Sequence, residues 1–520
     1  MDETFDYIVV GAGSAGCVVA ARLSAHPAAT VLLLEAGPPP ASPWITMPAG
    51  LPRLLGRSRY NWPDMAAPAP GLNGRSLWIG HGRTLGGSSA INGMVYNRGH
   101  PADFDAWERS GCPGWGSTDV LQHFRAVEAA VQPSQLAYVH PSVEAFVNAG
   151  VALGLPASGE DDRDREGIGL CRMSVRAGRR RSSYDAFVAE GWPRHNLEIR
   201  AGAEISHILI DHHRAMGVDY VRGDGHRQAY ARCEVIVCAG TIDSPRLLMV
   251  SGIGPGEHLR KMGVAVTRDS AGVGANLQDH LAIGLTLETT KMGSLNPSIA
   301  GWRQLLHGVR YLVSRTGPAT LGSSSGQAIV CTGTDVSRPQ VQLNFRPFSV
   351  SRSDRAAYKV DARPAVSASA TWLHPRSRGT VRLTGSGFRD RPSIDPGYLS
   401  DHRDADGMVT ALRLLAAVFA TEPVRSLVTS TNIAGSAEQT DAETLAYIRA
   451  GATSMAHPVG TCRMSASADA VVDPDLRVRG IERLRVADAS VMPDLPSGNT
   501  NAAAMMIGDK AATIIERAWR

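Results

Sequence analysis

The sequence predicts an α/β protein that begins with a Rossmann-like dinucleotide-binding domain. Residues 5–37 read FDYIVVGAGSAGCVVAARLSAHPAATVLLLEAG, in which two apolar runs flank a glycine-rich turn and a segment of helical composition. The glycines stand in a G-x-G-x-x-G pattern, and the second apolar run ends in the acid Glu35. A strand, tight turn, helix and strand in about thirty residues is the context that a dinucleotide fingerprint requires.

Each glycine of this fingerprint has a separate physical task. Gly11 permits the tight turn that leaves the first strand. Gly13 has no Cβ, so the backbone can approach a pyrophosphate, and Gly16 lets the helix pack closely on the sheet. The three spacings therefore predict a phosphate-binding turn and not only a flexible loop.

The groups around the turn complete the predicted nucleotide site. Ser14 and Ala15 begin the helix, where free N–H groups and the positive end of the helix dipole attract phosphates. Glu35, followed by Ala36, is placed to accept hydrogen bonds from ribose hydroxyls. Taken alone, this fingerprint allows NAD as well as FAD.

The composition indicates a globular protein of two intertwined domains, because 520 residues are too many for one compact core. Hydrophobic residues make up 43% of the chain, and the formal net charge is only +4. No nucleic-acid-binding module is visible. Residues 179–181, three arginines, form the one compact basic run, and we interpret them as a solvated surface.

The spacing of the cysteines and the lengths of the apolar segments indicate the cellular compartment of the protein. The seven cysteines are scattered without zinc or iron–sulfur spacing, so we predict no metal site and reduced thiols of a cytoplasmic protein. We expect no signal peptide, since the nucleotide fold begins at once, and no window has the length of a transmembrane helix. Peripheral membrane attachment stays open.

Hydrophobic periodicity predicts the main elements along the rest of the chain. Residues 38–75, rich in Pro, Gly and Trp, are expected to be extended and full of turns. Amphipathic helices are expected at 119–130 and 141–153, and further helices at 302–314 and 404–420. Strands are expected within 197–210, at 218–220 and 235–237, and at 341–345 and 380–383.

A second glycine-rich stretch, GRTLGGSSAINGMV at 82–95, has the composition to bring backbone amides onto a flat, electron-rich group. It resembles the first signature of the glucose–methanol–choline (GMC) oxidoreductases, and YNRG with DFDAW, to residue 107, extends the likeness. The resemblance implies FAD as the cofactor. In this stretch it implies cofactor contacts at Arg83, Gly86, Gly87, Asn92, Gly93, Met94 and Val95.

Residues 239–255, AGTIDSPRLLMVSGIGP, resemble the second signature of the family. We expect a strand to end at Ala239 beside the cofactor, Ser244 to cap a helix, and Pro245 to occupy its first turn. The string VGANLQDH at 273–280 also resembles the family, and we interpret Asp279 and His280 as a structural turn.

The last seventy residues carry the strings that resemble the catalytic part of the family: MAHPVGTCRM from 455, LRVADASVMP from 484 and PSGNTNA from 496. An alcohol loses a hydroxyl proton and a hydride on oxidation, and the proton needs a base such as His457. Asn499 matches the second active-site position, where it can donate a hydrogen bond to the substrate oxygen; Asn501 is the competing candidate. The resemblance also implies cofactor contacts at Ile205, Asp488, Ala489, Asn499 and Thr500.

Two departures from relatives are informative. Relatives with covalently bound flavin carry a histidine just before the Asn of the first signature, where this chain has Ile91. Isoleucine cannot bond to a flavin, so we expect noncovalent FAD. Ala456 stands where some oxidases have a large aromatic residue before the histidine, which favours a bulkier or less restricted substrate.

The resemblance implies a discontinuous FAD-binding domain (1–160, 195–285 and 452–520) intertwined with an α+β substrate-binding domain built on an antiparallel sheet (161–194 and 286–451). The expected reaction is oxidation of an alcohol, with a primary alcohol favoured, to an aldehyde or ketone, with hydride transfer to flavin N5. We slightly favour a dehydrogenase, passing electrons to a quinone or another acceptor, over an oxidase. The alternatives are a peroxide-producing oxidase, for example on a heteroaromatic hydroxymethyl compound such as pyridoxine, and a non-redox member such as a hydroxynitrile lyase.

Overall fold

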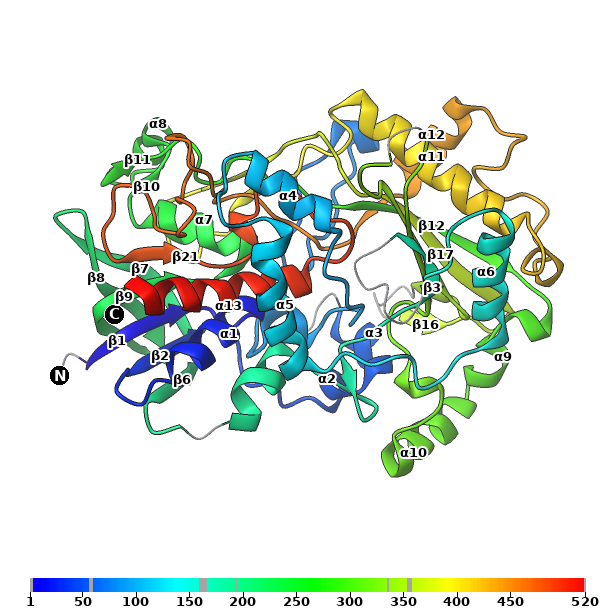
Figure 1. The fold of residues 1–520 in the computed structure, drawn as a ribbon, viewed down its shortest axis with the longest axis horizontal. Helices are drawn as coiled ribbons and strands as arrows, with labels where there is room; N and C mark the ends of the chain where they lie inside the picture. Colours follow the sequence, from blue (N-terminus) through cyan, green and yellow to red (C-terminus); the bar gives the residue numbers. More distant parts are fainter. Residues whose placement is uncertain are drawn as a thin grey trace.

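Two sheets side by side organise the protein (Figure 1). The computed structural model describes residues 3–55, 59–158, 166–191, 194–333, 336–352 and 358–518. Both chain ends lie beside the first sheet, so the chain leaves this domain and returns to it. The predicted α/β class with a Rossmann-like domain and an antiparallel second sheet is confirmed.

The first sheet has the strand order β6-β2-β1-β9-β8-β7, and β21 also pairs with β9. Its parallel strands are β1 (Glu3–Val10), β2 (Val31–Glu35), β6 (Leu197–Ala201), β9 (Gly225–Val237) and β21 (Leu484–Val486). The strands β7 (Ala203–Asp211) and β8 (Arg214–Arg222) add an antiparallel edge. In register, Val10 lies beside Leu34 and Val237, so three strands end together at one edge. Ligands of open α/β sheets bind at this carboxyl edge.

Helices cover the first sheet because parallel strands are buried on both faces. The helix α1 (Ser14–Leu23) connects β1 to β2 and packs against α13 (Asn501–Ala518), the red helix in Figure 1. In turn α13 packs against α5 (Ser117–Val131), which follows α4 (Pro101–Arg109). The N-terminal fingerprint and the last helix are therefore direct neighbours.

The second sheet is antiparallel, in the order β20-β12-β17-β14-β13-β3. Its strands are β3 (Gly167–Leu170), β12 (Leu281–Glu288), β13 (Gly326–Val330), β14 (Val341–Arg346), β17 (Ala365–Trp372) and β20 (Thr453–Ser454). One face forms an apolar core with α6 (Pro141–Ala152) and α11 (His402–Phe419). In β14, Leu343 and Phe345 belong to that core, so the alternating residues Gln342 and Asn344 point to the opposite face.

The four expected helices are present, as α5, α6, α10 (Arg303–Ser314) and α11. The smaller helices are α2 (Pro43–Thr46), α3 (Leu51–Leu54), α7 (Gly240–Val250), α8 (Gly256–Lys261), α9 (Asn296–Ile299) and α12 (Asp441–Gly451). The predicted domain border at 160/161 lies outside the described residues. The exact borders stay a prediction, although α6 and β3 contribute to the second core.

The expected cap of α7 is wrong. The helix begins at Gly240, so Ser244 lies one turn inside it and donates to Asp488 Oδ2 at 2.6 Å. Pro245 is tolerated there because the carbonyl that its missing N–H would have bonded, Thr241 O, accepts from Thr461 Oγ1 at 2.6 Å. A tertiary contact has replaced a helical hydrogen bond.

The interpretation of the arginine run as solvated surface is also wrong, because Arg180 and Arg181 are buried. Arg181 pairs with Glu190. Arg180 donates through Nε to Ile45 O at 2.8 Å and through Nη1 to Asn92 Oδ1 at 2.7 Å. Burial lowers the pKa of Arg180 to about 9. Charge runs in sequence do not reveal such internal acceptors.

The seven cysteines are free thiols. Within the described ranges, no three His, Cys, Asp or Glu side chains are grouped so that they could hold a metal ion. Across the same ranges, every helix falls short of the length or the apolar character of a membrane-spanning segment.

Candidate active site

The fingerprint glycines are fixed by close backbone packing. Gly11 has a φ of +99°, and a Cβ there would lie 2.5 Å from Cys238 O. A Cβ on Gly16 would lie 1.9 Å from Gly11 O, whereas one on Gly13 would have its nearest neighbour at 3.9 Å. Gly11 and Gly16 are thus required by the fold, and Gly13 leaves an open face at the helix start.

The start of α1 has the properties of an anion-binding site. Gly13 is its N-cap and no side chain caps the first turn, so the first N–H groups have no side-chain partner there. Ser14 Oγ donates to Asn501 Oδ1 at 2.7 Å, which joins the starts of α1 and α13. Two helix N-termini therefore lie together at this edge.

The second glycine stretch docks on the first. Gly86 donates its N–H to Ala12 O at 2.7 Å. Gly87 has a φ of +51°, and a Cβ there would lie 2.6 Å from Gly13 Cα. The stretch predicted to face the flavin ring and the one predicted to hold the phosphates are consequently one continuous surface.

Glu35 is buried behind the turn, with its carboxylate held by backbone N–H groups. Oε2 accepts from Ala12 N at 3.0 Å and Oε1 from Gly37 N at 2.8 Å. Burial raises the pKa of Glu35 to about 7, against the lowering effect of those two N–H donors. Gly37 O in turn accepts from Gly202 N at 2.9 Å, which brings the start of β7, with Ile205, to this end of the turn.

Nearby, Arg83 pairs with Glu204 of β7, and Ala36 is half-buried beside Glu35. At the C-terminal end of the second glycine-rich stretch, Asn92 Oδ1 accepts from Met94 N at 3.0 Å. Gly93 O accepts from Ser323 Oγ at 3.1 Å. Val95 continues this stretch in a bridge to Met173.

Asp488 links the predicted diphosphate region to α7. Oδ2 accepts from Gly240 N at 2.8 Å as well as from Ser244, and Oδ1 accepts from Ser490 N at 2.8 Å. Ala239 is the N-cap of α7, and Ala489 O accepts from Gly460 N at 3.3 Å. Both carboxylate oxygens of Asp488 thus position backbone, and burial raises its pKa.

These observations fit a bound dinucleotide. An open Cβ position at Gly13, the uncapped start of α1 and a buried acid at the end of β2 would supply the phosphate and ribose contacts of such a group. Gly11, Gly13, Ser14, Ala15, Gly16, Glu35, Gly86 and Gly87 would hold it at this edge.

His457 is the centre of a second group of side chains. It is buried, and its backbone N–H donates to Asp279 Oδ1 at 2.8 Å. The preceding Ala456 has a φ of +58°, a left-handed conformation that turns the chain sharply before the histidine. The loop is held further by Met455 N, which donates to His280 O at 2.9 Å.

Hydrogen bonds assign the proton positions on the two histidines. His280 Nε2 lies 2.8 Å from Leu373 O, a pure acceptor, so Nε2 carries the proton and Nδ1 of neutral His280 is an acceptor. His457 Nδ1 lies 3.1 Å from His280 Nδ1 and therefore donates to it. Nε2 of His457 then carries a lone pair and no proton.

That lone pair faces Asn499. Asn499 Nδ2 lies 3.1 Å from His457 Nε2. The amide cannot turn easily, because its Oδ1 accepts from Asn97 Nδ2 at 2.8 Å and from Gln342 Nε2 at 3.2 Å. Asn501, the competing candidate, instead contacts Ser14. Thr500, between them, precedes α13 and accepts from Ala504 N at 3.0 Å.

Burial sets the charge state of this pair. It lowers the pKa of His457 well below the ordinary value, and the neighbouring His280 lowers that pKa further. Burial also lowers the pKa of His280 to about 4. Both rings are neutral at pH 7, so His457 can accept a proton there.

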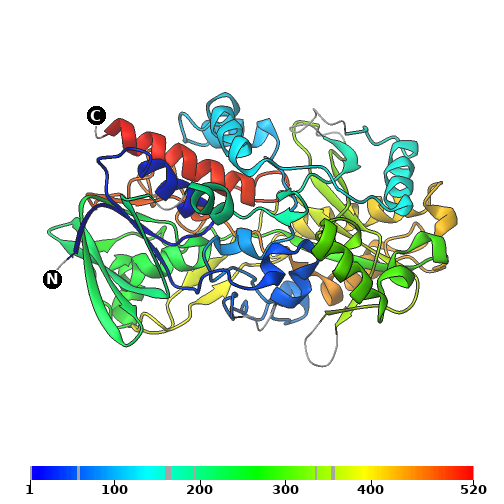
Figure 2. The same cartoon turned by 90° about the horizontal axis from the view of Figure 1, so that it is seen from below.

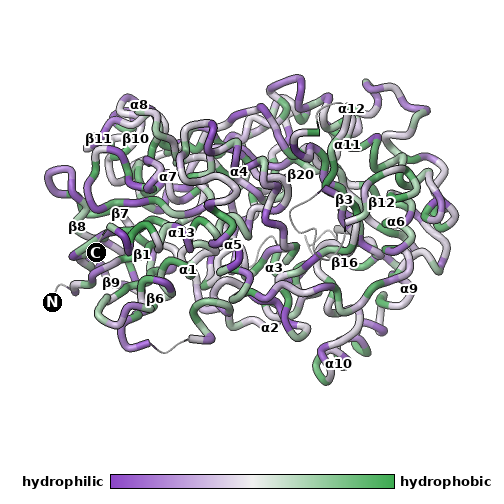
Figure 3. Tube along the Cα trace, viewed as in Figure 1, coloured by the Kyte–Doolittle hydropathy of each residue, from purple (hydrophilic) through white to green (hydrophobic). Residues whose placement is uncertain are grey.

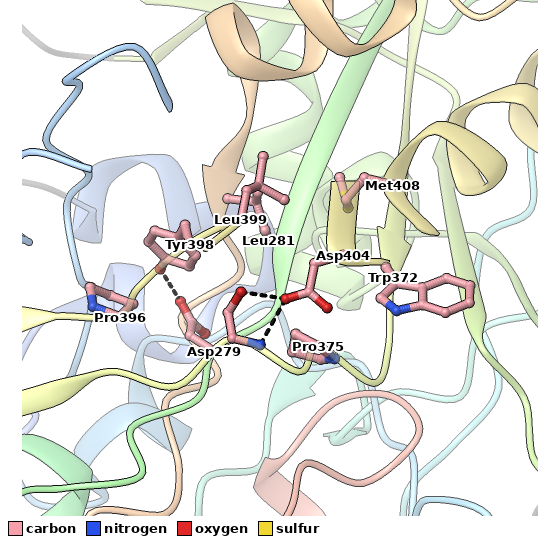
Figure 4. Close-up of a pocket in the computed structure, with 10 residues that line it drawn as sticks. Asp279, Leu281, Trp372, Pro375, Pro396, Tyr398, Leu399, Asp404 and Met408 are labelled. Atoms are coloured by element: carbon pink, nitrogen blue, oxygen red, sulfur yellow. Dashed lines mark hydrogen bonds between the residues drawn. The ribbon is translucent and has the colours of Figure 1, made fainter. Parts of the chain in front are cut away.

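Asp279, which accepts from the backbone N–H of His457, also bonds Tyr398 (Figure 4). Its Oδ2 accepts from Ser454 Oγ at 2.5 Å and from Tyr398, and burial raises its pKa to about 6. The cavity beside Tyr398 and Asp279 is about 20 Å³, which is space for roughly one water and not for a substrate. A larger hollow of about 680 Å³ is lined by none of the sequence-predicted site residues.

The interpretation of Asp279 and His280 as a structural turn misses their contacts with His457. The string VGANLQDH that contains them was recognisable in the sequence. Only the fold brings His280 and His457, which are 177 positions apart, into contact. Asn97 and Gln342 were also missed, since single amides carry no sequence pattern. Gln342 Oε1 is buried and has no hydrogen-bond partner among the described residues, which leaves an acceptor near Asn499.

Comparison with known proteins identifies the family. The GMC oxidoreductase family models match residues 5–282 (N-terminal part) and 375–508 (C-terminal part). The chain belongs to the GMC oxidoreductase family. It is thereby an FAD-dependent oxidoreductase that acts on CH–OH groups, as the sequence predicted.

Three relatives place the chain within this family. It is 37% identical to "Alcohol dehydrogenase [acceptor]" of Pseudomonas putida, covering 99% of this chain and 96% of the relative. It is 37% identical to mitochondrial choline dehydrogenase of Homo sapiens, covering 99% and 90%. The crystal structure of pyridoxine 4-oxidase from Mesorbium loti is similar with a TM-score of 0.87 and 32% identity, covering 99% of each chain.

Proposed function

We propose that this enzyme oxidises a primary alcohol to an aldehyde, with His457 as the base and Asn499 as the donor to the substrate oxygen. The observation that carries the proposal is the unprotonated Nε2 of His457, whose lone pair accepts from Asn499 Nδ2 at 3.1 Å. FAD, when bound, supplies the hydride acceptor at flavin N5.

An alcohol oxygen that binds beside His457 Nε2 and Asn499 Nδ2, in place of their direct hydrogen bond, meets one acceptor and one donor. It can donate its proton to Nε2 of His457 and accept a hydrogen bond from Nδ2 of Asn499, which stabilises the developing alkoxide. His280 accepts from Nδ1–H and gains hydrogen-bond strength as His457 becomes positively charged. Asn97 and Gln342 keep the amide donor aimed at the oxygen.

The variant His457→Ala tests the base. We expect the purified protein to stay yellow with unchanged flavin content and to lose about 10²–10⁴ of kcat, the usual contribution of a positioned base. His26→Ala, an exposed histidine in a turn, is the matched control and should keep full activity. Unchanged turnover in His457→Ala would remove His457 from this role.

The alcohol itself is best identified with a panel. Aliphatic primary alcohols, aromatic alcohols, polyols, choline and hydroxymethyl heteroaromatics such as pyridoxine are mixed anaerobically with the enzyme, and bleaching of the flavin absorbance is recorded. Reduction by one class defines the substrate. If no alcohol bleaches the flavin, a non-redox reaction such as that of a hydroxynitrile lyase replaces the proposal.

We favour a dehydrogenase over an oxidase, supported by the alcohol and choline dehydrogenases among the relatives, although pyridoxine 4-oxidase supports the opposite choice. Peroxide formation in air and reduction of a quinone or dye are measured with the same alcohol. Dye reduction without stoichiometric peroxide is the expected result.

We also propose that FAD is bound without a covalent link. Ile91, whose side chain has no reactive group, stands in the position before Asn92, and it is buried with Ala90 and Ile45. Acid precipitation should release all flavin into the supernatant as intact FAD. Yellow colour that stays in the washed pellet would contradict this.

A further inference from the structure

The helix α10 turns its apolar side away from the protein. The exposed fractions of Leu305, Val309, Leu312 and Val313 are 73%, 59%, 67% and 83%, whereas Tyr311 is buried at 2%. An amphipathic helix of a globular protein normally has the opposite arrangement, with its apolar stripe toward the core. Figure 1 shows α10 projecting at the lower edge of the second domain, and Figure 2 looks at the molecule from that side.

The apolar residues form one narrow stripe. At 100° per residue, they fall within an arc of about 120°, and Tyr311, which attaches the helix to the protein, lies on the other side. In Figure 3 the helix carries apolar colour at the surface of the molecule. The members of the stripe are Trp302, Leu305, Leu306, Val309, Leu312 and Val313.

Positive charge borders this stripe. Arg303 and Arg310, both exposed, lie along one edge of it. The segment 289–334 contains these two arginines together with Lys291 and Arg315. The sequence of this segment has no Asp or Glu. A helix with an apolar stripe, an aromatic residue at one end and cationic neighbours has the features of helices that lie in the interface of a bilayer.

We propose that α10 docks this enzyme on an anionic lipid bilayer, with the apolar stripe between the headgroups and Arg303 and Arg310 against lipid phosphates. Charge complementarity selects this occupant. A second copy docking through the same stripe would bring the two cationic edges together without any carboxylate in 289–334 to compensate.

The helix α10 belongs to the second domain and is connected to the predicted cofactor site through the chain that follows it. The chain runs from Arg315 at the end of α10 to Ser323, which donates to Gly93 O at 3.1 Å. Docking therefore holds the second domain against the bilayer, where a lipid-soluble alcohol would be available. The docking itself does not depend on which alcohol is oxidised.

The experiment is co-sedimentation of the holoenzyme with vesicles. Vesicles of phosphatidylcholine mixed with phosphatidylglycerol are compared with pure phosphatidylcholine, and the bound fraction is followed by flavin absorbance. We expect binding to the anionic vesicles that weakens with salt. The triple variant Leu305→Glu/Val309→Glu/Leu312→Glu should lower the partition coefficient at least about tenfold, since it replaces three of the six apolar residues of the stripe by negative charges.

Matched variants separate the contributions. Val151→Glu/Leu153→Glu introduces charge at exposed apolar positions at the end of α6 and should leave binding unchanged. Arg303→Gln/Arg310→Gln should reduce the preference for anionic vesicles, whereas Arg260→Gln/Lys261→Gln on α8, with the same change of net charge, should not.

Three outcomes would overturn the proposal: active wild-type enzyme that stays in the supernatant with anionic vesicles, a triple variant that binds like the wild type, or a concentration-dependent dimer that the triple variant abolishes while no vesicle is bound. The last result would assign the stripe to a second copy.

Discussion

At the scale of single residues, the position of the proton on His457 decides the chemistry of the site. With the proton on Nδ1, Nε2 is the nitrogen that can accept a proton. Leu373 O fixes the tautomer of His280, and His280 then fixes that of His457. The lone pair of His457 Nε2 consequently faces Asn499 and not the interior. His280 is in this sense a positioning residue: it acts through His457 and contacts no reacting atom.

The variant pair His280→Leu and His280→Asn tests this positioning. Leucine removes the acceptor for Nδ1–H, so we expect kcat to fall about a hundredfold or more, as expected for a misoriented base. Asparagine offers an amide oxygen and should recover part of the loss. Flavin content should not change in either variant. Equal losses in the two variants would leave His280 with a packing role only.

The pH dependence of kcat/KM follows from the lowered pKa of His457. Burial and the neighbouring His280 keep that pKa well below the ordinary value, so the base loses its lone pair only in acid. We expect activity to stay constant as the pH falls through about 6.5, the usual histidine pKa, and to decline below it. A decline of kcat/KM that begins at or above pH 6.5 in the wild type and is absent in His457→Ala would contradict this.

The lowered pKa of His280 has a consequence for folding stability. Because the pKa of His280, about 4, is lower in the folded state, the unfolded chain takes up a proton first as the pH falls below about 6.5. The contribution of this residue to stability is therefore present above that pH and declines toward pH 4.

At the scale of elements, periodicity and punctuation predicted most of what forms. The fingerprint strands and helix and the amphipathic helices α5, α6, α10 and α11 follow from local pattern, which the sequence displays directly. The start of α7 did not follow, because Thr461 satisfies the carbonyl that Pro245 leaves free. A helix boundary that depends on a distant hydroxyl has no local signal.

Gly16→Ala tests the close packing of α1 on the sheet. A Cβ at Gly16 would lie 1.9 Å from Gly11 O, a backbone atom that cannot move without disturbing the turn. We expect loss of bound FAD and a destabilisation of about 3 kcal/mol or more. Gly308→Ala is the matched control: it is also a helical glycine, with nothing within 4 Å of its Cβ position. It should leave flavin content unchanged and raise stability by up to about 1 kcal/mol. Equal flavin content in both variants would contradict the packing role of Gly16.

At the scale of the whole molecule, distant parts of the chain are joined by buried polar contacts as well as by the two cores. Arg391 bonds Asp64 through Nε at 2.8 Å and Asp243 of α7 through Nη1 at 2.8 Å. These three residues come from separate parts of the sequence. Burial alone would raise the pKa of Asp243, but Arg246 and Arg391 hold it below its usual range.

Arg391→Gln tests this connection. Two buried carboxylates would each lose a cationic partner, and we expect a loss of roughly 2–4 kcal/mol in the free energy of unfolding. The loss should shrink as the pH falls below about 4, because protonated carboxyls need no cation. Arg389→Gln, which removes an exposed pair with Glu204, should cost less than about 1 kcal/mol. Denaturant unfolding of both variants measures the difference, and equal values would refute the connection.

The sequence by itself predicted the nucleotide fold and pointed to His457 as the candidate base. Gly11, Gly13, Gly16 and Glu35 lie in one local unit, where spacing translates directly into geometry, and His457 stands in a string that resembles the catalytic segment of the family. The tertiary structure alone decided the partners of that base. His280, Asn97 and Gln342 come from strand ends and loops far apart in the chain, and their meeting at His457 and Asn499 depends on how the two sheets pack. Likewise, the sequence predicted a helix at 302–314, but only the fold showed that the apolar side of α10 faces outward. The local sequence pattern determines which side chains share one face of a helix or strand. The packing of the whole chain determines whether that face contacts the core, another element or solvent.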